Sequence, residues 1–174
     1  MSSITSCARR LLLPLIACLG LLAAAAPALA GTLVNYVSRA GTGSIVVDTR
    51  ARQLYLILGH GQAMRYPVGV GRLGKQWAGV FRIAGRYAEP NWAPPAAIRR
   101  DSPDLPALIP GGHPSNPMGA AAMTLAGGDY AIHGTNNPGS IGGFVSYGCI
   151  RMHNDDIVDL MSRVRIGTRV EVVL

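Results

Sequence analysis

Apolar residues in this chain fall into short runs separated by glycine-containing turns, and this spacing restricts the fold more than any other feature of the sequence. Within residues 53–58, leucine alternates with Tyr55 and Ile57, which is the two-residue period of a β-strand. Comparable runs predict further strands over residues 45–48, 62–70, 80–87, 121–125, 129–133 and 168–173. We therefore expect a mainly β domain of short antiparallel strands joined by tight turns.

One segment near the C-terminus has the period of a helix instead. Its apolar positions recur at i, i+3, i+4 and i+7, namely Ile157, Leu160, Met161 and Val164. We predict a helix over residues 155–164, with Asn154 as its N-cap and Gly167 as its stop signal. Residues 138–145 are predicted to form a brief helix or a loop.

Residues 90–117 break the strand pattern. They contain eight of the twelve prolines and few periodic apolar positions, which predicts a long ordered loop. Loops of this length inside a compact domain commonly carry function. Trp92 near its start and residues 116–119 at its end are suited to anchor it, so we interpret the segment as a lid over a site.

The first thirty residues have the pattern of a secretory signal peptide. Arg9 and Arg10 precede an apolar stretch, and Ala28-Leu29-Ala30 matches a small-residue cleavage site. Cleavage after Ala30 predicts an exported protein of the periplasm or cell envelope, with no membrane attachment. A lipoprotein whose Cys18 carries the lipid is a minor alternative.

Residues 31–43 then form a short flexible lead, and residues 44–174 have the size of one domain. Removing two arginines and no acidic residue lowers the formal net charge from +7 to +5. A basic exported protein suits the anionic polymers of a cell envelope. The basic residues are scattered and lack interleaved aromatic residues, so we expect no nucleic-acid partner.

Cys149 is the only cysteine that remains after the predicted signal peptide. An unpaired thiol in an oxidising compartment is either buried and inert or kept for its chemistry. His133 lies sixteen residues earlier, and both residues lie next to a glycine. A neighbouring histidine accepts the thiol proton and pairs with the thiolate. We therefore predict a Cys149 nucleophile with His133 as its base, and a thiol pKa well below the ordinary value of about 8.5.

Neighbouring residues can supply the rest of such a site. We expect the Gly134 carbonyl to hold the second imidazole nitrogen and set its tautomer. The N–H groups of Tyr147, Gly148 and Cys149 are expected to form an oxyanion hole. Arg151, two residues after Cys149 on an extended segment, should point the same way and suits a substrate carboxylate.

Other functions for these residues are less consistent with the sequence. A lone histidine, arginine or thiol is more often structural, but the coincidence of all three favours catalysis. Metal binding would need several ligands at a regular spacing, and one mature cysteine with dispersed histidines does not provide it. We interpret His60, His113 and His153 as surface residues. Neither a metal nor another cofactor is therefore expected. Residues 69–74 match the dinucleotide-binding fingerprint, but the following residues 77–81 are not helical, which indicates a turn instead.

The chain resembles the catalytic domain of the L,D-transpeptidase family (YkuD type). The motif of that family is a His-Gly pair, an interval, and Ser/Thr-His-Gly-Cys followed by an apolar residue and arginine. This sequence has His-Gly-Thr-Asn at 133–136 and Ser-Tyr-Gly-Cys-Ile-Arg-Met at 146–152. Further similar segments lie at 66–71, 92–95, 110–112 and 116–120, so the resemblance covers roughly residues 44–174.

The resemblance implies a β-sandwich-like fold whose substrate is the stem peptide of peptidoglycan. It implies that Cys149 attacks a tetrapeptide stem, releases D-alanine and passes the acyl group to an amine. We expect Ser146, Thr135, Asn136 and Trp92 to contact the substrate together with the residues named above. Acylation of the cysteine by carbapenems is implied as well.

Two positions depart from the family pattern. Tyr147 stands where the family usually has histidine, which should change the polarity of the site more than abolish catalysis. Trp77-Ala78 replaces the usual Thr-Pro before a glycine.

The acyl acceptor stays open at this point. A second stem would give a 3-3 crosslink, an envelope protein would become anchored to the wall, and water would make the protein an L,D-carboxypeptidase. A non-catalytic wall-binding module is a different class, for which Tyr147 is the hint. A redox thiol is disfavoured because no resolving cysteine remains after the signal peptide.

Overall fold

The structure of the protein is a computed structural model that describes residues 30–174; residues 1–29, which hold most of the predicted signal peptide and Cys18, lie outside the described residues. The described strands are β1 (Thr32–Asn35), β2 (Ile45–Asp48), β3 (Gln53–Gly59), β4 (Gln62–Pro67), β5 (Val70–Gly71), β6 (Gly79–Ala88), β7 (Ala121–Leu125), β8 (Ala131–His133), β9 (Phe144–Ser146), β10 (Ile150–Arg151) and β11 (Arg169–Val173). The helices are α1 (Ala96–Asp101), α2 (Asn154–Arg163) and the short 3-10 helix η1 (Pro138–Ser140).

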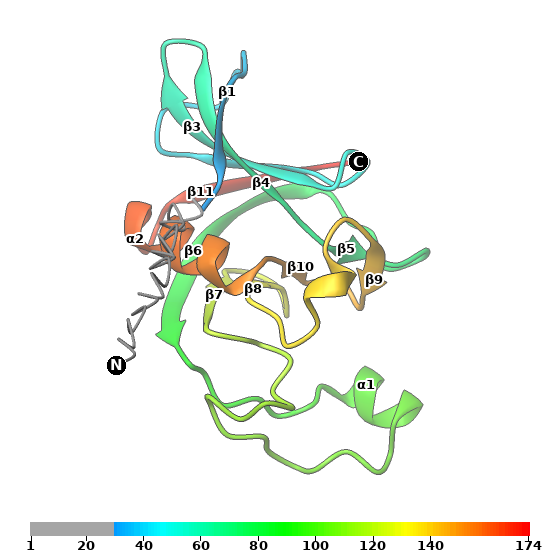
Figure 1. Ribbon diagram of the computed structural model, residues 1–174. Helices are drawn as coiled ribbons and strands as arrows, with labels where there is room; N and C mark the ends of the chain where they lie inside the picture. Colours follow the sequence, from blue (N-terminus) through cyan, green and yellow to red (C-terminus); the bar gives the residue numbers. More distant parts are fainter. Residues whose placement is uncertain (1–29) are drawn as a thin grey trace, which may run out of the picture.

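One long strand, β6, joins the two halves of the main sheet. The nine strands of this sheet follow the order β1-β4-β3-β2-β11-β6-β7-β8-β10. The first part of β6 pairs with β11 and the later part with β7, with a register shift between Ile83 and Gly85. Such irregularities bend a strand, so the two halves face each other across the core (Figure 1). The expected mainly β, sandwich-like architecture is confirmed.

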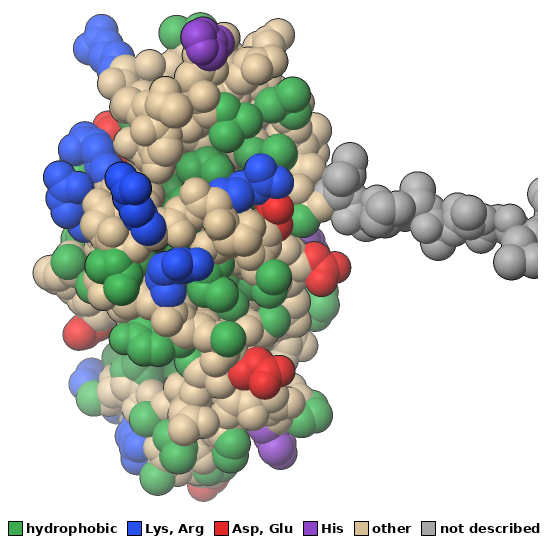
Figure 2. Space-filling model, turned by 90° about the vertical axis from the view of Figure 1, so that its left-hand side faces the viewer, with side chains coloured by type: hydrophobic (Ala, Val, Ile, Leu, Met, Phe, Trp, Pro, Cys, Tyr) green, Lys and Arg blue, Asp and Glu red, His purple; other side chains and the backbone are tan. Residues whose placement is uncertain are grey.

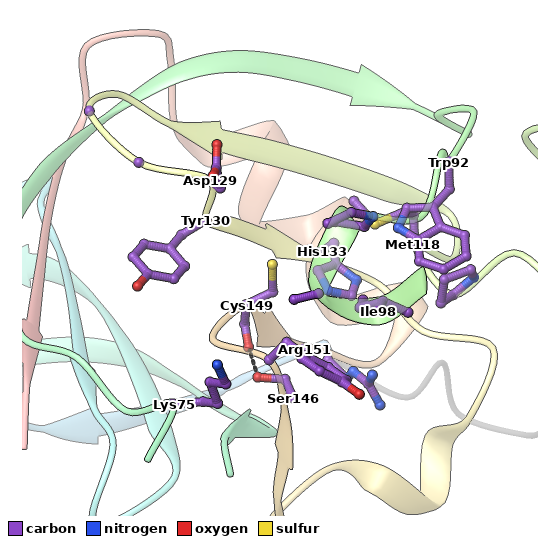
Figure 3. Close-up of a pocket in the computed structure, with 16 residues that line it drawn as sticks. Lys75, Trp92, Ile98, Met118, Asp129, Tyr130, His133, Ser146, Cys149 and Arg151 are labelled. Atoms are coloured by element: carbon purple, nitrogen blue, oxygen red, sulfur yellow. Dashed lines mark hydrogen bonds between the residues drawn. The ribbon is translucent and has the colours of Figure 1, made fainter. Parts of the chain in front are cut away.

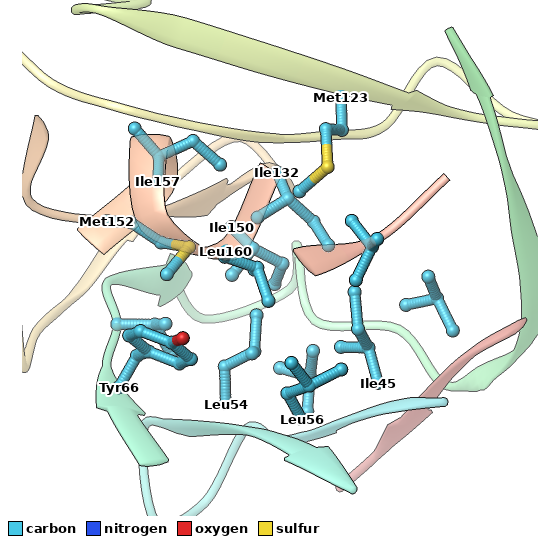
Figure 4. Close-up of a cluster of buried hydrophobic side chains, with 14 of the residues drawn as sticks. Ile45, Leu54, Leu56, Tyr66, Met123, Ile132, Ile150, Met152, Ile157 and Leu160 are labelled. Carbon is cyan, nitrogen blue, oxygen red and sulfur yellow. The ribbon is translucent and has the colours of Figure 1, made fainter. Parts of the chain in front are cut away.

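The core lies between the two halves of the sheet, and α2 closes one side of it. Side chains from β2, β3 and β4 meet those from β7, β8 and β10 (Figure 4). On α2, Ile157 and Leu160 are fully buried, as the predicted helical period requires. Because these residues hold β7, β8 and β10 together, the packing fixes the strands that carry His133 and Arg151.

The pairing of the strands corrects one prediction. Each predicted strand is present, but the expected run of antiparallel strands is wrong in part, because β2 with β11, β8 with β10, and β5 with β9 are parallel pairs. The predicted strand over 62–70 is two elements, β4 and β5. Parallel partners lie far apart in the chain, so alternation within one strand does not identify them.

The flexible lead predicted over residues 31–43 is also wrong in part. Strand β1 lies within it and pairs with β4 from Thr32 opposite Arg65 to Asn35 opposite Gln62. Beyond β1, Tyr36 stacks on Tyr55 with ring centroids 4.1 Å apart. This segment therefore covers a small second cluster on the outer face of the sheet, formed by Val46, Ile57 and Ala63.

The ends of α2 differ from the prediction. Its N-cap is His153, and Asn154 is the first helical residue, so the capping role predicted for Asn154 is wrong. The helix ends at Arg163, four residues before Gly167. The turn predicted for residues 69–74 is consistent with the structure, since β5 and a turn occupy them and no helix follows before β6.

The surface and the helices give two further facts. No helix within residues 30–174 combines the length and the apolar character that crossing a membrane requires. On the face shown in Figure 2, Lys and Arg side chains lie mainly in the upper and middle parts, interspersed with apolar and neutral side chains.

Candidate active site

Two neighbouring parallel strands bring the predicted catalytic residues together. Strand β10 runs beside β8, with Arg151 opposite His133. The Met152 N–H donates to the His133 carbonyl at 2.8 Å and secures this register. Cys149 immediately precedes β10. The three side chains line one cavity of about 470 Å³ (Figure 3).

His133 is buried, with 4% of its surface exposed, and its ring is held by backbone carbonyls. Nδ1 lies 2.6 Å from the Gly134 carbonyl oxygen, which is the contact expected from the sequence. A carbonyl only accepts, so Nδ1 carries the proton and Nε2 is left unprotonated. Burial lowers the pKa of His133 to about 4, although hydrogen bonding to the backbone carbonyls of Gly134 and Pro117 favours the charged form; the Arg151 charge lowers the pKa further. His133 is therefore a neutral imidazole at neutral pH.

Close packing explains the glycine that follows His133. A Cβ at Gly134 would lie 2.3 Å from Asn154 Oδ1 and 3.0 Å from the Ala120 nitrogen. Asn154 Oδ1 accepts from the N–H groups of Ala120, at 3.1 Å, and Thr135, at 3.0 Å. The Asn154 carboxamide thus links the start of α2 to the segments on either side of His133, and only glycine fits between them.

Cys149 is a half-buried residue that lines the cavity. Burial raises its pKa above the ordinary value, opposed by the Ala131 backbone amide and the Arg151 charge. The predicted lowered thiol pKa is therefore wrong in direction. A neutral His133 provides no positive charge that would stabilise a thiolate. At rest, the cavity thus holds a protonated thiol and a neutral imidazole.

A hydrogen-bonded turn fixes the backbone around Cys149. The Ser146 hydroxyl donates to the Cys149 carbonyl at 2.6 Å and accepts from the Gly148 N–H at 3.0 Å. Ser146 is buried, so these contacts are shielded from water. Ser146, which was expected to contact substrate and lines the cavity, therefore also shapes the turn that presents the thiol.

The predicted oxyanion hole needs one correction. The Gly148 N–H is already bonded to Ser146 and cannot serve a substrate oxygen. Among the described residues, the N–H groups of Tyr147 and Cys149 make no hydrogen bond. These two donors are the ones left for an oxyanion.

An aromatic wall supports Gly148 from the other side. The Trp77 Nε1–H donates to the Gly148 carbonyl at 2.7 Å. The Trp77 ring stacks on Tyr130 with centroids 4.2 Å apart and meets Phe81 edge-on at 4.9 Å. Gly148 has a φ of 128°, and a Cβ there would lie 2.6 Å from the Tyr130 ring. Trp77, one of the two departures from the family pattern, thus braces the turn before Cys149.

Arg151 offers the cavity a guanidinium without a protein partner. Its Nε is a buried donor that lacks a hydrogen bond within the described part of the chain. Burial lowers the pKa of Arg151, yet arginine stays charged. Buried donors are normally satisfied, so this one is suited to a ligand carboxylate or carbonyl.

The cavity has two chemically different ends, one on each side of the Cys149 sulfur (Figure 3). Trp92, Ile98 and Met118 lie on the same side as His133 and make that end apolar. The other end has Tyr130 with Lys75 and Asp129. These two charged residues were missed in the sequence, because single exposed charges in turns have no local signature.

Two predicted site residues lie elsewhere. The hydroxyl of Thr135, a buried residue, accepts from the Asn137 N–H at 3.0 Å. Asn136 donates to the Pro114 carbonyl at 3.2 Å. Both line a second, separate pocket with Glu89 and Asn154, and neither lines the Cys149 cavity. Their position next to His133 in the sequence does not bring them to the thiol, because β8 ends there and the chain turns away.

Metal ligands do not gather in the described part of the chain. Among residues 30–174, no three or more His, Cys, Asp or Glu side chains are grouped so that they could hold a metal ion. The chemistry at hand is that of a thiol, an imidazole, two free amides and a guanidinium.

Comparisons with known proteins agree with this geometry. The family model for the L,D-transpeptidase catalytic domain matches residues 42–172. The Escherichia coli K12 protein named "Probable L,D-transpeptidase YbiS" is 37% identical over 139 residues, which is 75% of this chain and 44% of that protein. The chain therefore spans less than half the length of this relative.

Solved structures show the same fold. An L,D-transpeptidase from Mycobacterium smegmatis has a TM-score of 0.56 and 20% identity over 75% of this chain and 58% of that one. The Enterococcus faecium L,D-transpeptidase has a TM-score of 0.60 and 18% identity over 76% of this chain and 50% of that one. From the match over residues 42–172, we conclude that the chain belongs to the L,D-transpeptidase catalytic domain family.

Proposed function

We propose that this protein is a peptidoglycan L,D-transpeptidase with Cys149 as nucleophile and His133 as base. The observation that carries the proposal is the placement of a neutral imidazole, held through Nδ1 by the Gly134 carbonyl, in the same cavity as the Cys149 thiol. We assign acceptance of the thiol proton to Nε2, the ring nitrogen that the Gly134 carbonyl does not hold. A thiol and a base in one cavity are what nucleophilic acyl transfer requires.

In the acylation step, Cys149 Sγ attacks the carbonyl carbon of the bond that precedes the terminal D-alanine of a tetrapeptide stem. The thiol proton passes to His133 Nε2 as the S–C bond forms. The imidazolium then protonates the leaving amine, the C–N bond breaks, and a thioester and free D-alanine result. Because the resting pair is neutral, proton transfer accompanies the attack and is not complete before it.

Two groups support the charges of this step. The free N–H groups of Tyr147 and Cys149 stabilise the tetrahedral oxyanion. Arg151, with its unpartnered Nε, binds the carboxylate of the stem. The same cation favours the thiolate form of Cys149.

In the second step, an amine attacks the thioester carbonyl. Its proton passes to His133 and from there to the departing sulfur, which restores the thiol. The side-chain amine of a diaminopimelate on a second stem gives a 3-3 crosslink, and this is the acceptor we propose. An amine of an envelope protein gives wall anchoring and water gives carboxypeptidase activity, so the products identify the acceptor.

The cellular location of the protein and the role of residues 90–117 follow from the same proposal. The substrate requires a place in the periplasm or cell envelope, consistent with the predicted signal peptide and its cleavage after Ala30. Residues 90–117 act as a lid over the donor stem, since Trp92 and Ile98 line the apolar end of the cavity. Trp92→Ala should weaken substrate use more than folding, and equal losses of activity and thermal stability would contradict the lid.

Mass spectrometry tests the function directly. The purified protein is incubated with disaccharide-tetrapeptide, in parallel with Cys149→Ala. A dimer lighter by one D-alanine, absent with the variant, is expected. Tripeptide without dimer would identify hydrolysis, and no product from a folded protein would overturn the proposal.

A further inference from the structure

Helix α1 lies at the cavity of Cys149 with little apolar packing to hold it there. Its residues Ala97 and Ile98 line the cavity, yet none of its residues is buried. Figure 3 shows Ile98 among the side chains that surround the thiol. Arg99 donates to the carbonyls of Pro94 and Ala107, both in the same loop. The position of α1 relative to the rest of the domain therefore depends on other contacts.

Those contacts lie at the last residue of the helix. Asp101 Oδ2 accepts from the Tyr147 hydroxyl and, at 3.1 Å, from Arg72 Nη2. The Arg72 guanidinium also lies over the Tyr147 ring, with Cζ 3.8 Å from the centroid. We call these three residues the clasp. Among the described residues, they make the only side-chain hydrogen bonds between α1 and a segment outside the loop.

The clasp connects α1 to the turn that presents the thiol. Tyr147 stands between Ser146 and Gly148, whose mutual hydrogen bond shapes that turn. Arg72 is tied to the same place through its backbone, since its N–H donates to the Ser146 carbonyl at 2.9 Å. The Tyr147 hydroxyl and Arg72 lower the pKa of Asp101, so its carboxylate stays charged at neutral pH. None of the three side chains hydrogen-bonds to Cys149 or His133.

We infer that the clasp holds α1 against the Cys149 cavity, and that Tyr147 is a positioning residue which sets how substrate is held and how the thiol is reached. The part concerning substrate rests on the proposed function; the part concerning access to the thiol does not. Releasing the clasp lowers the population of the closed arrangement, and apparent affinity falls by the same fraction. The chemical step keeps its groups and its rate.

Three variants test the clasp in the purified protein. Tyr147→Phe removes the hydroxyl but keeps the ring under Arg72, and Asp101→Asn removes the charge from an exposed helix end. Glu171→Gln is the control, because it breaks another solvent-accessible ion pair, with Arg169 at 3.0 Å on β11, outside the Cys149 cavity. Each protein is labelled at Cys149 with small iodoacetamide and with a bulky fluorescein maleimide, and its Tm is recorded.

The clasp variants are expected to react with the bulky reagent about threefold to tenfold faster, with less than a twofold change for iodoacetamide and an unchanged Tm. KM for the tetrapeptide should rise by a similar factor in both clasp variants, while kcat for Asp101→Asn, whose residue does not line the cavity, stays within about twofold. Salt at about 1 M should move the parent protein towards the variants, because an exposed ion pair is screened. Glu171→Gln should match the parent in every measurement.

Unchanged bulky labelling in both clasp variants would overturn the inference. Equal acceleration by both reagents, or a fall in kcat with KM constant, would also overturn it, because these results indicate a disturbed catalytic turn. If Tyr147→Phe folds poorly, Asp101→Asn decides alone. The clasp variants could react faster with the bulky reagent while the parent protein makes no crosslink. That result would support the clasp and refute the proposed function.

Discussion

Lowering the pH should destabilise the fold through His133. Its pKa is about 4 in the folded protein and about 6.5 in an unfolded chain. Below pH 6.5 His133 is protonated in the unfolded state but not in the folded state. The contribution of His133 to the free energy of unfolding is therefore fully present above pH 6.5 and is lost as the pH falls towards 4. The difference of about 2.5 units corresponds to a loss of about 2 kcal/mol at pH 5 and about 3 kcal/mol at pH 4.

Urea unfolding of the protein and of His133→Gln, at neutral pH and at about pH 5, isolates this contribution. The glutamine cannot titrate, so the difference between the two proteins should shrink by about 2 kcal/mol at the lower pH. Carboxylates that titrate in the same pH range contribute equally to the stability of both proteins, so their contribution cancels in the difference. His60→Gln, at an exposed turn, is the control and should behave like the parent. Parallel pH dependences of parent and His133→Gln would refute the assignment of a buried neutral imidazole.

Three substitutions around the thiol should show how much each contact contributes to the turn that presents Cys149. Ser146→Ala leaves the Gly148 N–H and the Cys149 carbonyl without their buried partner, and should cost about 1–3 kcal/mol of unfolding free energy in urea titrations. Gly148→Ala should cost about 2 kcal/mol or more, because its φ is 128° and the Cβ meets the Tyr130 ring; a Tm equal to that of the parent would contradict this. Trp77→Phe keeps an aromatic ring but removes the hydrogen bond to the Gly148 carbonyl. It should lower the free energy of unfolding by about 1 kcal/mol and slow acylation of the thiol. An unchanged rate of acylation would show that Trp77 does not position the turn.

The elements of the fold were largely predictable, because each depends on local sequence. Alternation within residues 53–58 and the helical period of residues 155–164 reflect burial of one face, which a single segment records by itself. Strand β1 was not predicted from the sequence, because its residues are mostly exposed and pair only with β4. The role of Asn154 escaped for a similar reason, since its partners Ala120 and Thr135 are distant in the chain.

The candidate site was predictable in its chemistry but not in its electrostatics. A single cysteine after the predicted signal peptide, a histidine beside a glycine and a following arginine indicate acyl transfer by their residue types alone. The direction of the pKa shifts depends on how deeply the folded chain buries each group, and burial reverses the thiol pKa expected from the pairing with His133. Likewise, the use of the Gly148 N–H by Ser146 is a property of one turn geometry.

The sequence by itself therefore determined which reactive groups the protein has, where most of its longer strands and its longest helix lie, and which family it resembles, because residue type and local periodicity are written along the chain. Only the tertiary structure decided that β8 and β10 run parallel, that Thr135 and Asn136 face away from the thiol, and that Tyr147 meets Asp101 and Arg72. These features arise from contacts between residues far apart in sequence. Long-range packing selects such contacts, and no local pattern encodes them.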